Sequence, residues 1–289
     1  MTSERTILIA GVTGHQGGAV AQALQGTGFQ LRGLTRKSDS ERAKALARHG
    51  VDVVQGDLDD EATLRRALAG AWGVFGVQNT AEAGVEREEE QGKRLATLAR
   101  EAGVEHFVYT SVGSAHERTG IPHFDNKWRI EETVRSLGFP SHVILRPVFF
   151  MENLVAPFSL QGSTLAVALD PGTKLQMIAV DDIGWFGARA FTDAAALNRR
   201  EIDLAGDVRT MPAAAEILTE TLGRPIAFAQ TPTEQVRQYS EGMALMLEWF
   251  EHVGYSADID GLEREFGRGL TKLPDWARRH ARPNREQYI

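Results

Sequence analysis

The feature that most constrains this chain is an apolar run near the N-terminus that breaks into a glycine-rich turn. The run is residues 7–10 (ILIA), the turn is residues 11–18 (GVTGHQGG), and helix-forming sequence follows as far as Gln25. A buried strand, a glycine turn and a helix start in this order let backbone N–H groups and the positive end of a helix dipole hold a pyrophosphate. The spacing is GxxGxxG, not GxGxxG, so a tight turn that binds no ligand is the alternative interpretation. We expect a dinucleotide site here.

Short apolar runs alternate with helical patterns through the first half of the chain. The expected strands are residues 7–10, 29–34, 51–54, 73–77, 106–110 and 142–145, and the expected helices are 18–25, 39–49, 60–69, 85–102 and 124–137. Regular alternation of this kind predicts an α/β fold with a parallel sheet covered by helices on both faces. A ligand of such a sheet lies beyond the carboxyl ends of the strands, where the strand order reverses.

The pattern changes after residues 146–147 (RP). Residues 151–175 are interpreted as a loop, residues 278–283 (RRHARP) as a mobile tail, and the apolar side chains of 243–250 as a core-facing helix face. The other expected elements are strands 175–180 and 201–204 and helices 181–191, 212–222 and 233–252. We place a domain boundary near residue 150, with residues 175–206 contributing return segments to the first domain.

Composition argues against several classes of protein. The 289 residues include no cysteine, which excludes disulfides and thiol catalysis and suits a reducing, cytoplasmic location. The net charge of −7 does not favour nucleic acid as a partner. No apolar stretch approaches the ~20 residues of a membrane span, and the N-terminus lacks the pattern of a signal peptide. The histidines show no metal-ligand spacing, so we expect no metal site.

The end of the second expected strand indicates which dinucleotide binds. That strand runs into Thr35, Arg36 and Lys37, with no acidic residue at its tip. A carboxylate at this point would accept hydrogen bonds from the ribose hydroxyls of NAD, whereas cations attract the 2′-phosphate of NADP. Arg36 can also stack its guanidinium on the adenine. The alternative is that Arg36 and Lys37 are two solvated surface cations. If they bind the phosphate, we expect a preference for NADP over NAD.

Polar residues after the next two strands are further candidates. Asp57, in the segment 56–58 (GDL), is expected to accept a hydrogen bond from the adenine amino group or to cap the following helix, and one residue can do both. Gln78 and Asn79 end the fourth expected strand, where they are expected to line the cofactor ribose.

Several short segments together carry a family resemblance. They are residues 11–18, 35–36 (TR), 56–58, 110–111 (TS), 123–127 (HFDNK), 146–147 and 180–184 (VDDIG). In this order they resemble the NmrA-like group of atypical short-chain dehydrogenases/reductases, over almost the whole chain. The resemblance implies a Rossmann doubly wound parallel sheet in residues 1–150, a smaller C-terminal α/β domain in 151–289 for a substrate or partner, and NADP(H) as cofactor. The residues expected to bind the cofactor are Gly11, Thr13, Gly14, His15, Gln16, Gly17, Arg36, Lys37, Asp57, Leu58, Gln78, Asn79 and Lys127.

The resemblance also points to a catalytic site, with one departure. Short-chain reductases use a Tyr-x-x-x-Lys helix and a serine that orients the substrate oxygen; Ser111 and Lys127 stand at the serine and lysine positions, but His123 replaces the tyrosine. His123 is a proton donor or acceptor, a pocket-lining residue, or a helix-start residue without a chemical role. Lys127 holds the ribose or is a solvated surface lysine. Tyr109 shares a strand face with Ser111 and is a further candidate acid, although a core position is favoured.

Three functions compete. The first is an NADP(H)-binding protein that senses redox state or regulates a protein partner, with little or no turnover, since NmrA-like proteins include regulators without demonstrated chemistry. The second is an NADPH-dependent oxidoreductase acting on a small apolar carbonyl, quinone or imine, because related isoflavone-type and quinone reductases transfer hydride; Phe149, Phe150 and Met151 then wall the substrate pocket or pack in the core. The third is an interaction module with a vestigial cleft. A homodimer is one expectation for the assembly.

Overall fold

The computed structural model describes residues 5–281. Within them the chain forms two compact units. Unit 1 comprises the residues up to His116 together with Pro122–Arg146 and Ile183–Ile202, and unit 2 comprises Glu117–Ile121, Pro147–Asp182 and the residues from Asp203 onward. In the described part of the chain, no helix is both long enough and apolar enough to span a bilayer.

The main sheet has seven strands. They are β1 (Thr6–Ile9), β2 (Gln30–Thr35), β3 (Asp52–Gln55), β4 (Ala71–Gly76), β5 (His106–Thr110), β6 (Ser141–Pro147) and β11 (Glu201–Leu204). Their order is β11-β6-β5-β4-β1-β2-β3, and the pairs from β3 through to β6 are parallel. The strand order therefore reverses between β1 and β4, which is where a doubly wound sheet opens a crevice for a ligand.

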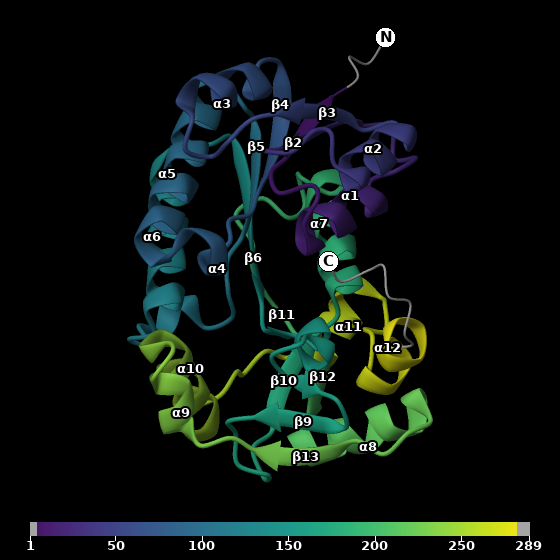
Figure 1. The fold of residues 1–289 in the computed structure, drawn as a ribbon. Coiled ribbons are helices and arrows are strands. Elements are labelled where there is room, and N and C mark those ends of the chain that lie inside the picture. Colours follow the sequence, from purple (N-terminus) through teal and green to yellow (C-terminus); the bar gives the residue numbers. More distant parts are fainter. Residues whose placement is uncertain (1–4, 282–289) are drawn as a thin grey trace. The chain divides into compact units, whose positions relative to one another are not determined.

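Helices cover both faces of this sheet, as Figure 1 shows. One face carries α3 (Glu61–Leu68), α5 (Val85–Glu101) and α6 (Pro122–Ser136), and the other carries α1 (His15–Ala23), α2 (Glu41–Arg48) and α7 (Val180–Thr192). Because both faces are covered, the central strands are largely apolar and buried; Ile7, Leu8 and Ile9 are all fully buried. Gly184 allows α7 to approach α1 closely, since a Cβ there would lie 2.7 Å from the backbone of Ala19.

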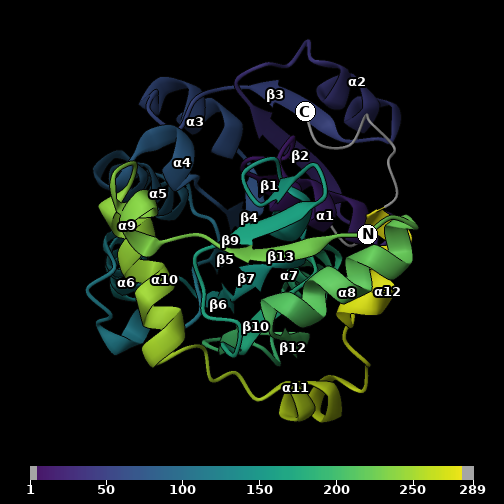
Figure 2. The same cartoon turned by 60° about the horizontal axis from the view of Figure 1, so that its bottom comes forward.

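Within the described residues, unit 2 contains two small sheets and five α-helices that follow β12. One sheet joins β12 (Asp207–Arg209), β10 (Leu175–Ile178) and β7 (Phe149–Phe150), and the other joins β13 (Ala227–Gln230), β9 (Thr164–Val167) and β8 (Leu160–Gln161). The helices are α8 (Met211–Leu222), α9 (Thr233–Arg237), α10 (Glu241–His252), α11 (Ile259–Phe266) and α12 (Leu273–His280). In Figure 2, α8 lies along the β9–β13 pair.

The α/β class and the six expected strands of the first half are confirmed, and three predictions for the second half are wrong. Residues 151–175 are not one loop, because they contain the 3₁₀ helix Met151–Val155 and strands β8 and β9. Residues 233–252 form two helices, and the Ser240 hydroxyl accepts from the Met243 N–H to begin α10. Residues 278–280 belong to α12, which the fully buried Trp276 anchors, while 282–283 lie outside the described residues.

Candidate functional site

The glycine turn joins β1 to α1 beside the point where the strand order reverses. The Gly14 N–H donates to the Gly11 carbonyl at 2.8 Å, and Gly11 takes a φ of +58°, which favours glycine. A Cβ at Gly17 would lie 2.4 Å from the Gly11 carbonyl oxygen, so the turn folds directly onto the helix. The first turn of α1 carries no acidic residue, and its N-cap residue, Gly14, has no side chain that could cap the helix. Its backbone donors and its dipole are therefore available to an anion.

Side chains around this turn hold it against the neighbouring strands. The Arg42 guanidinium donates to the Thr13 carbonyl at 3.1 Å, and the Thr110 hydroxyl donates to the Gln16 side-chain oxygen at 2.7 Å. His15 is in the first turn of α1, and burial, followed by the charge of Arg42, lowers its pKa. His15 is thus uncharged at neutral pH and can offer an N–H to a ligand without adding charge.

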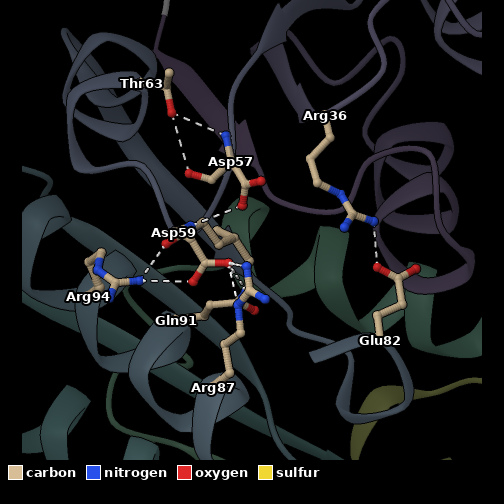
Figure 3. Close-up of polar contacts among 9 residues, drawn as sticks. Arg36, Asp57, Asp59, Thr63, Glu82, Arg87, Gln91 and Arg94 are labelled. Atoms are coloured by element: carbon tan, nitrogen blue, oxygen red, sulfur yellow. Dashed lines mark hydrogen bonds and ion pairs between the residues drawn. The ribbon is translucent and has the colours of Figure 1, made fainter. Parts of the chain in front are cut away.

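Arg36 follows β2 directly and extends toward α4 (Thr80–Ala83), the short helix after β4. Its guanidinium forms an ion pair with the Glu82 carboxylate, with 2.5 Å between Nη2 and Oε2 (Figure 3). The Lys37 N–H donates to the Thr35 hydroxyl at 3.3 Å, which shapes the turn that carries both cations. Sequence reasoning found Arg36 but missed its acidic partner, since nothing in the local sequence relates residue 82 to residue 36.

Asp57 does not cap the helix that follows it. The carboxylate of Asp60 accepts from the N–H groups of Ala62 and Thr63 and so begins α3. Asp57 instead closes a local turn, in which its carboxylate accepts from the Asp59 N–H at 3.0 Å. The capping alternative for Asp57 is therefore wrong.

A cluster of polar and charged side chains fixes the loop that carries Asp57 and Leu58. The Asp59 carboxylate accepts from Arg87 at 2.7 Å, Gln91 at 2.9 Å and Arg94 at 3.3 Å, all on α5 (Figure 3). Arg94 also donates to the Leu58 carbonyl at 2.8 Å. The hydrogen bond from Arg87, aided by Gln91 and the charges of both arginines, holds the pKa of Asp59 below its usual range. The cluster ties the loop to a long helix.

Gln78 and Asn79 follow β4 and differ in their surroundings. Gln78 is buried, and its side-chain oxygen has no hydrogen-bond partner among residues 5–281. A buried polar atom without a partner is unfavourable, which suits a group that a ligand satisfies. The Asn79 side-chain oxygen is committed to the structure, because it accepts from the Ala81 N–H at 3.0 Å and caps α4.

Lys127 is not a solvated surface lysine. It lies on α6 with its side chain only 14% exposed, and its ammonium is paired with the fully buried carboxylate of Glu88 on α5. The same carboxylate accepts from the Asn126 amide at 2.8 Å and from the Thr80 hydroxyl. Sequence reasoning missed Glu88 because it stands in an acidic run. The helical spacing from Glu88 to Gln91, Gly92 and Leu95, which are all buried, is the signal that could have separated it from its neighbours.

His123 lies in the first turn of α6, one helical turn before Lys127. Burial, followed by the charge of Lys127, lowers the pKa of His123 to about 4, and Glu88 only partly opposes this. The imidazole is therefore neutral at physiological pH. It can donate one hydrogen bond, but it is a much weaker acid-base group at this pH than an unperturbed histidine.

Tyr109 lies near the end of β5, Ser111 follows that strand directly, and both residues are buried. Neither hydroxyl has a hydrogen-bond partner in the described part of the chain. The Ser111 N–H donates to the Leu145 carbonyl at 2.7 Å, so its backbone is anchored while its side chain is uncommitted. Burial, reinforced by the charge of Glu88, raises the pKa of Tyr109 well above its usual range, so the phenol stays protonated.

Unit 1 contains every residue expected to bind the cofactor or to act in catalysis. They follow the carboxyl ends of β1 to β5 or lie on α1 and α6. Phe149, Phe150 and Met151 belong to unit 2, where Phe149 packs edge-on against Phe250 at 6.4 Å between ring centres. No group of three or more His, Asp or Glu side chains within residues 5–281 could hold a metal ion.

Comparisons with known proteins identify relatives of this chain. The model of the NmrA-like family matches residues 3–280. An NmrA-like family domain-containing protein of Dictyostelium discoideum is 25% identical, over 93% of this chain and 94% of its own. The NmrA-like oxidoreductase FrzB of Cladobotryum sp. is 34% identical over 161 residues, and the aligned segment spans 52% of this chain but only 48% of FrzB.

Two groups of solved structures share the fold. The NADPH-dependent quinone oxidoreductase QOR2 of Escherichia coli, complexed with NADPH, is 25% identical with a TM-score of 0.78, covering 94% of this chain and 98% of that one. Nmra, a negative transcriptional regulator in complex with NADP, is 20% identical with a TM-score of 0.78, covering 96% of this chain and 95% of that one. Since the family model spans nearly all of the sequence, this chain belongs to the NmrA-like family.

Proposed function

We propose that this protein binds NADP(H) in unit 1 and acts as a redox sensor or regulator with little or no turnover. The observation that carries the proposal is His123, which is neutral at physiological pH. It stands at the position where a short-chain reductase has the tyrosine that donates a proton to the substrate. A site with a nucleotide cradle and no effective proton donor suits holding a cofactor more than reducing a carbonyl. The family relative Nmra, a negative transcriptional regulator in complex with NADP, supports this proposal by analogy.

The residues present fit such a cofactor. The open N-terminus of α1, with Gly11, Gly14 and Gly17, suits a diphosphate, and Arg36 suits a 2′-phosphate. The remaining candidates, Thr13, His15, Gln16, Lys37, Asp57, Leu58, Gln78, Asn79 and Lys127, follow the same strand ends or lie on α1 and α6. The buried Gln78 oxygen, which has no hydrogen-bond partner among residues 5–281, supports a ligand at these strand ends.

A reductase is the second candidate, favoured by the uncommitted Ser111 hydroxyl beside the strand end of β5. When bound, NADPH supplies a hydride. Ser111 would donate to a substrate oxygen, while Lys127, held by Glu88, would hold a ribose hydroxyl. Quinones and iminium ions need little help from a proton donor, so they suit a site with neutral His123. QOR2 is named as an NADPH-dependent quinone oxidoreductase, which supports the choice of quinone as the first substrate to test.

The test begins with calorimetric titration of NADPH and NADH, which we expect to show tighter binding of NADPH. Arg36→Glu removes a charge-assisted hydrogen bond, worth about 1.5–3 kcal/mol, and should weaken NADPH binding by roughly 10-fold to 100-fold with little change for NADH. The exposed Arg48, in the last turn of α2, supplies the control Arg48→Glu with the same change of charge. Equal losses for NADPH and NADH in Arg36→Glu would contradict the assignment of Arg36.

Turnover separates the two candidates. NADPH absorbance is followed with a panel of small quinones, aldehydes and imines, and the regulatory proposal expects no substrate-dependent oxidation. Steady oxidation with a quinone, abolished by Lys127→Ala, would favour the reductase. Four further points stay predictions. The substrate panel tests for a small apolar substrate, and affinity capture tests for a regulatory protein partner. Sedimentation tests for a homodimer, and imaging tests the cytoplasmic location.

A further inference from the structure

We infer that Glu82 is a specificity-determining residue, which competes with the 2′-phosphate of NADP(H) for Arg36 and thereby limits the preference for the phosphorylated cofactor. The inference rests on the proposed function, because it assigns Arg36 to that phosphate. Glu82 lies outside both the glycine turn and the end of β2, the two segments from which the sequence predicts the cofactor.

The geometry brings the two residues together from separate strand ends. Arg36 comes directly after β2, and Glu82 lies in α4, which follows β4. Their side chains point toward one another in Figure 3, and 2.5 Å separates Nη2 of Arg36 from Oε2 of Glu82. The side chains are 62% and 56% exposed. The pair therefore lies at the surface, where a phosphate from solution can reach the guanidinium.

An exposed carboxylate is a weak partner for an arginine that can bind a phosphate. Ion pairs of this kind gain little because water screens them and two long side chains lose freedom. A phosphate dianion carries more charge than a carboxylate and accepts two parallel hydrogen bonds from the planar guanidinium. Binding the 2′-phosphate thus replaces the contact with Glu82, whereas NAD(H), which has no such phosphate, leaves it in place.

Glu82 remains near the phosphate after it loses Arg36, because α4 is anchored near its start. The Asn79 side chain caps the helix through the Ala81 N–H, and the Thr80 hydroxyl bonds to the buried Glu88 carboxylate. The displaced carboxylate then faces the bound phosphate at short range, and like charges repel. Both effects, competition and repulsion, weaken the binding of NADP(H) and spare that of NAD(H).

The experiment measures the dissociation constants of NADPH and NADH by calorimetry for the unaltered full chain and for Glu82→Gln. Removing a partner of this strength should tighten NADPH binding by roughly threefold to fivefold and change NADH binding by less than about twofold. The matched control is Glu86→Gln, at an exposed position in the first turn of α5. It removes the same charge four residues away and should leave the ratio of the two constants unchanged.

Salt gives a second readout. The gain from Glu82→Gln should shrink when ionic strength rises from about 0.05 M to 0.5 M, because screening acts on exposed charges. If Glu82→Gln has the same ratio of NADPH to NADH dissociation constants as the unaltered chain, or binds NADPH more weakly, the inference is overturned while the proposed function stays intact. Failure of the unaltered chain to bind either dinucleotide would overturn both. Thermal unfolding of the variant, compared with Glu86→Gln, verifies that both are folded.

Discussion

At the scale of single residues, Lys127 and Glu88 form a buried ion pair whose members depend on one another. Lys127→Met leaves the fully buried carboxylate of Glu88 without its cation, and breaking such a pair lowers the free energy of unfolding by about 3–5 kcal/mol. Urea unfolding should show this loss, and the double variant Glu88→Gln with Lys127→Met should recover part of it because no buried charge is left.

The control for this pair is Lys93→Met. It breaks a more exposed contact with Glu89, within α5, the helix that carries Glu88. Exposed pairs contribute about 1 kcal/mol or less, so this variant should stay close to the unaltered protein. A similar small loss in Lys127→Met and Lys93→Met would mean that Glu88 does not depend on Lys127 for its charge.

At the scale of the element, the junction of the glycine turn with α1 is the least tolerant of change. Gly17→Ala places a Cβ 2.4 Å from the Gly11 carbonyl oxygen, and backbone cannot move aside as a flexible side chain can. Overpacking of this kind lowers stability by about 1–3 kcal/mol and should also weaken NADPH binding, since the displaced turn carries the phosphate donors.

Thermal unfolding and calorimetry test this prediction against Gly172→Ala, where an added Cβ meets nothing within 4 Å. The control should unfold and bind as the unaltered chain does. Unchanged NADPH binding in Gly17→Ala would show that the turn does not hold the diphosphate.

The elements themselves differ in how well the sequence predicts them. The strands of the main sheet were predictable because a strand covered on both faces contains a nearly continuous apolar run. The segments Leu160–Gln161 and Thr164–Val167 were missed, since strands of two to four residues among glycine and serine have no periodicity to detect. The break near Ser240 was hidden because both sides of it have helical composition.

On the scale of the whole molecule, two histidines with strongly lowered pKa values contribute to the dependence of stability on pH. Burial is the main cause that lowers the pKa of His106 and of His123 to about 4 each. The unfolded chain takes up a proton near pH 6.5, but the folded chain does so only near pH 4. The unfolded state therefore binds more protons between these values, and the free energy of unfolding falls as pH is lowered, by up to about 3 kcal/mol for each histidine.

Urea unfolding measured between pH 7 and pH 5 checks this, because most carboxylates are still ionised in that window. His106→Phe should reduce the change of the free energy of unfolding with pH, whereas His49→Phe, at an exposed position, should not. A slope that stays the same in His106→Phe would show that the folded protein accommodates a charged imidazole there.

The sequence by itself determined the α/β class, the glycine turn and the cation after β2, because strand burial, backbone close approach and the sign of a charge are local properties of the chain. Only the tertiary structure decided which charges meet. Glu82 reaches Arg36 across 46 residues, and Glu88 reaches Lys127 across 39. The physical reason is that pairing depends on distance in space, and the order of strands in the sheet, which sets that distance, is not encoded in any one segment.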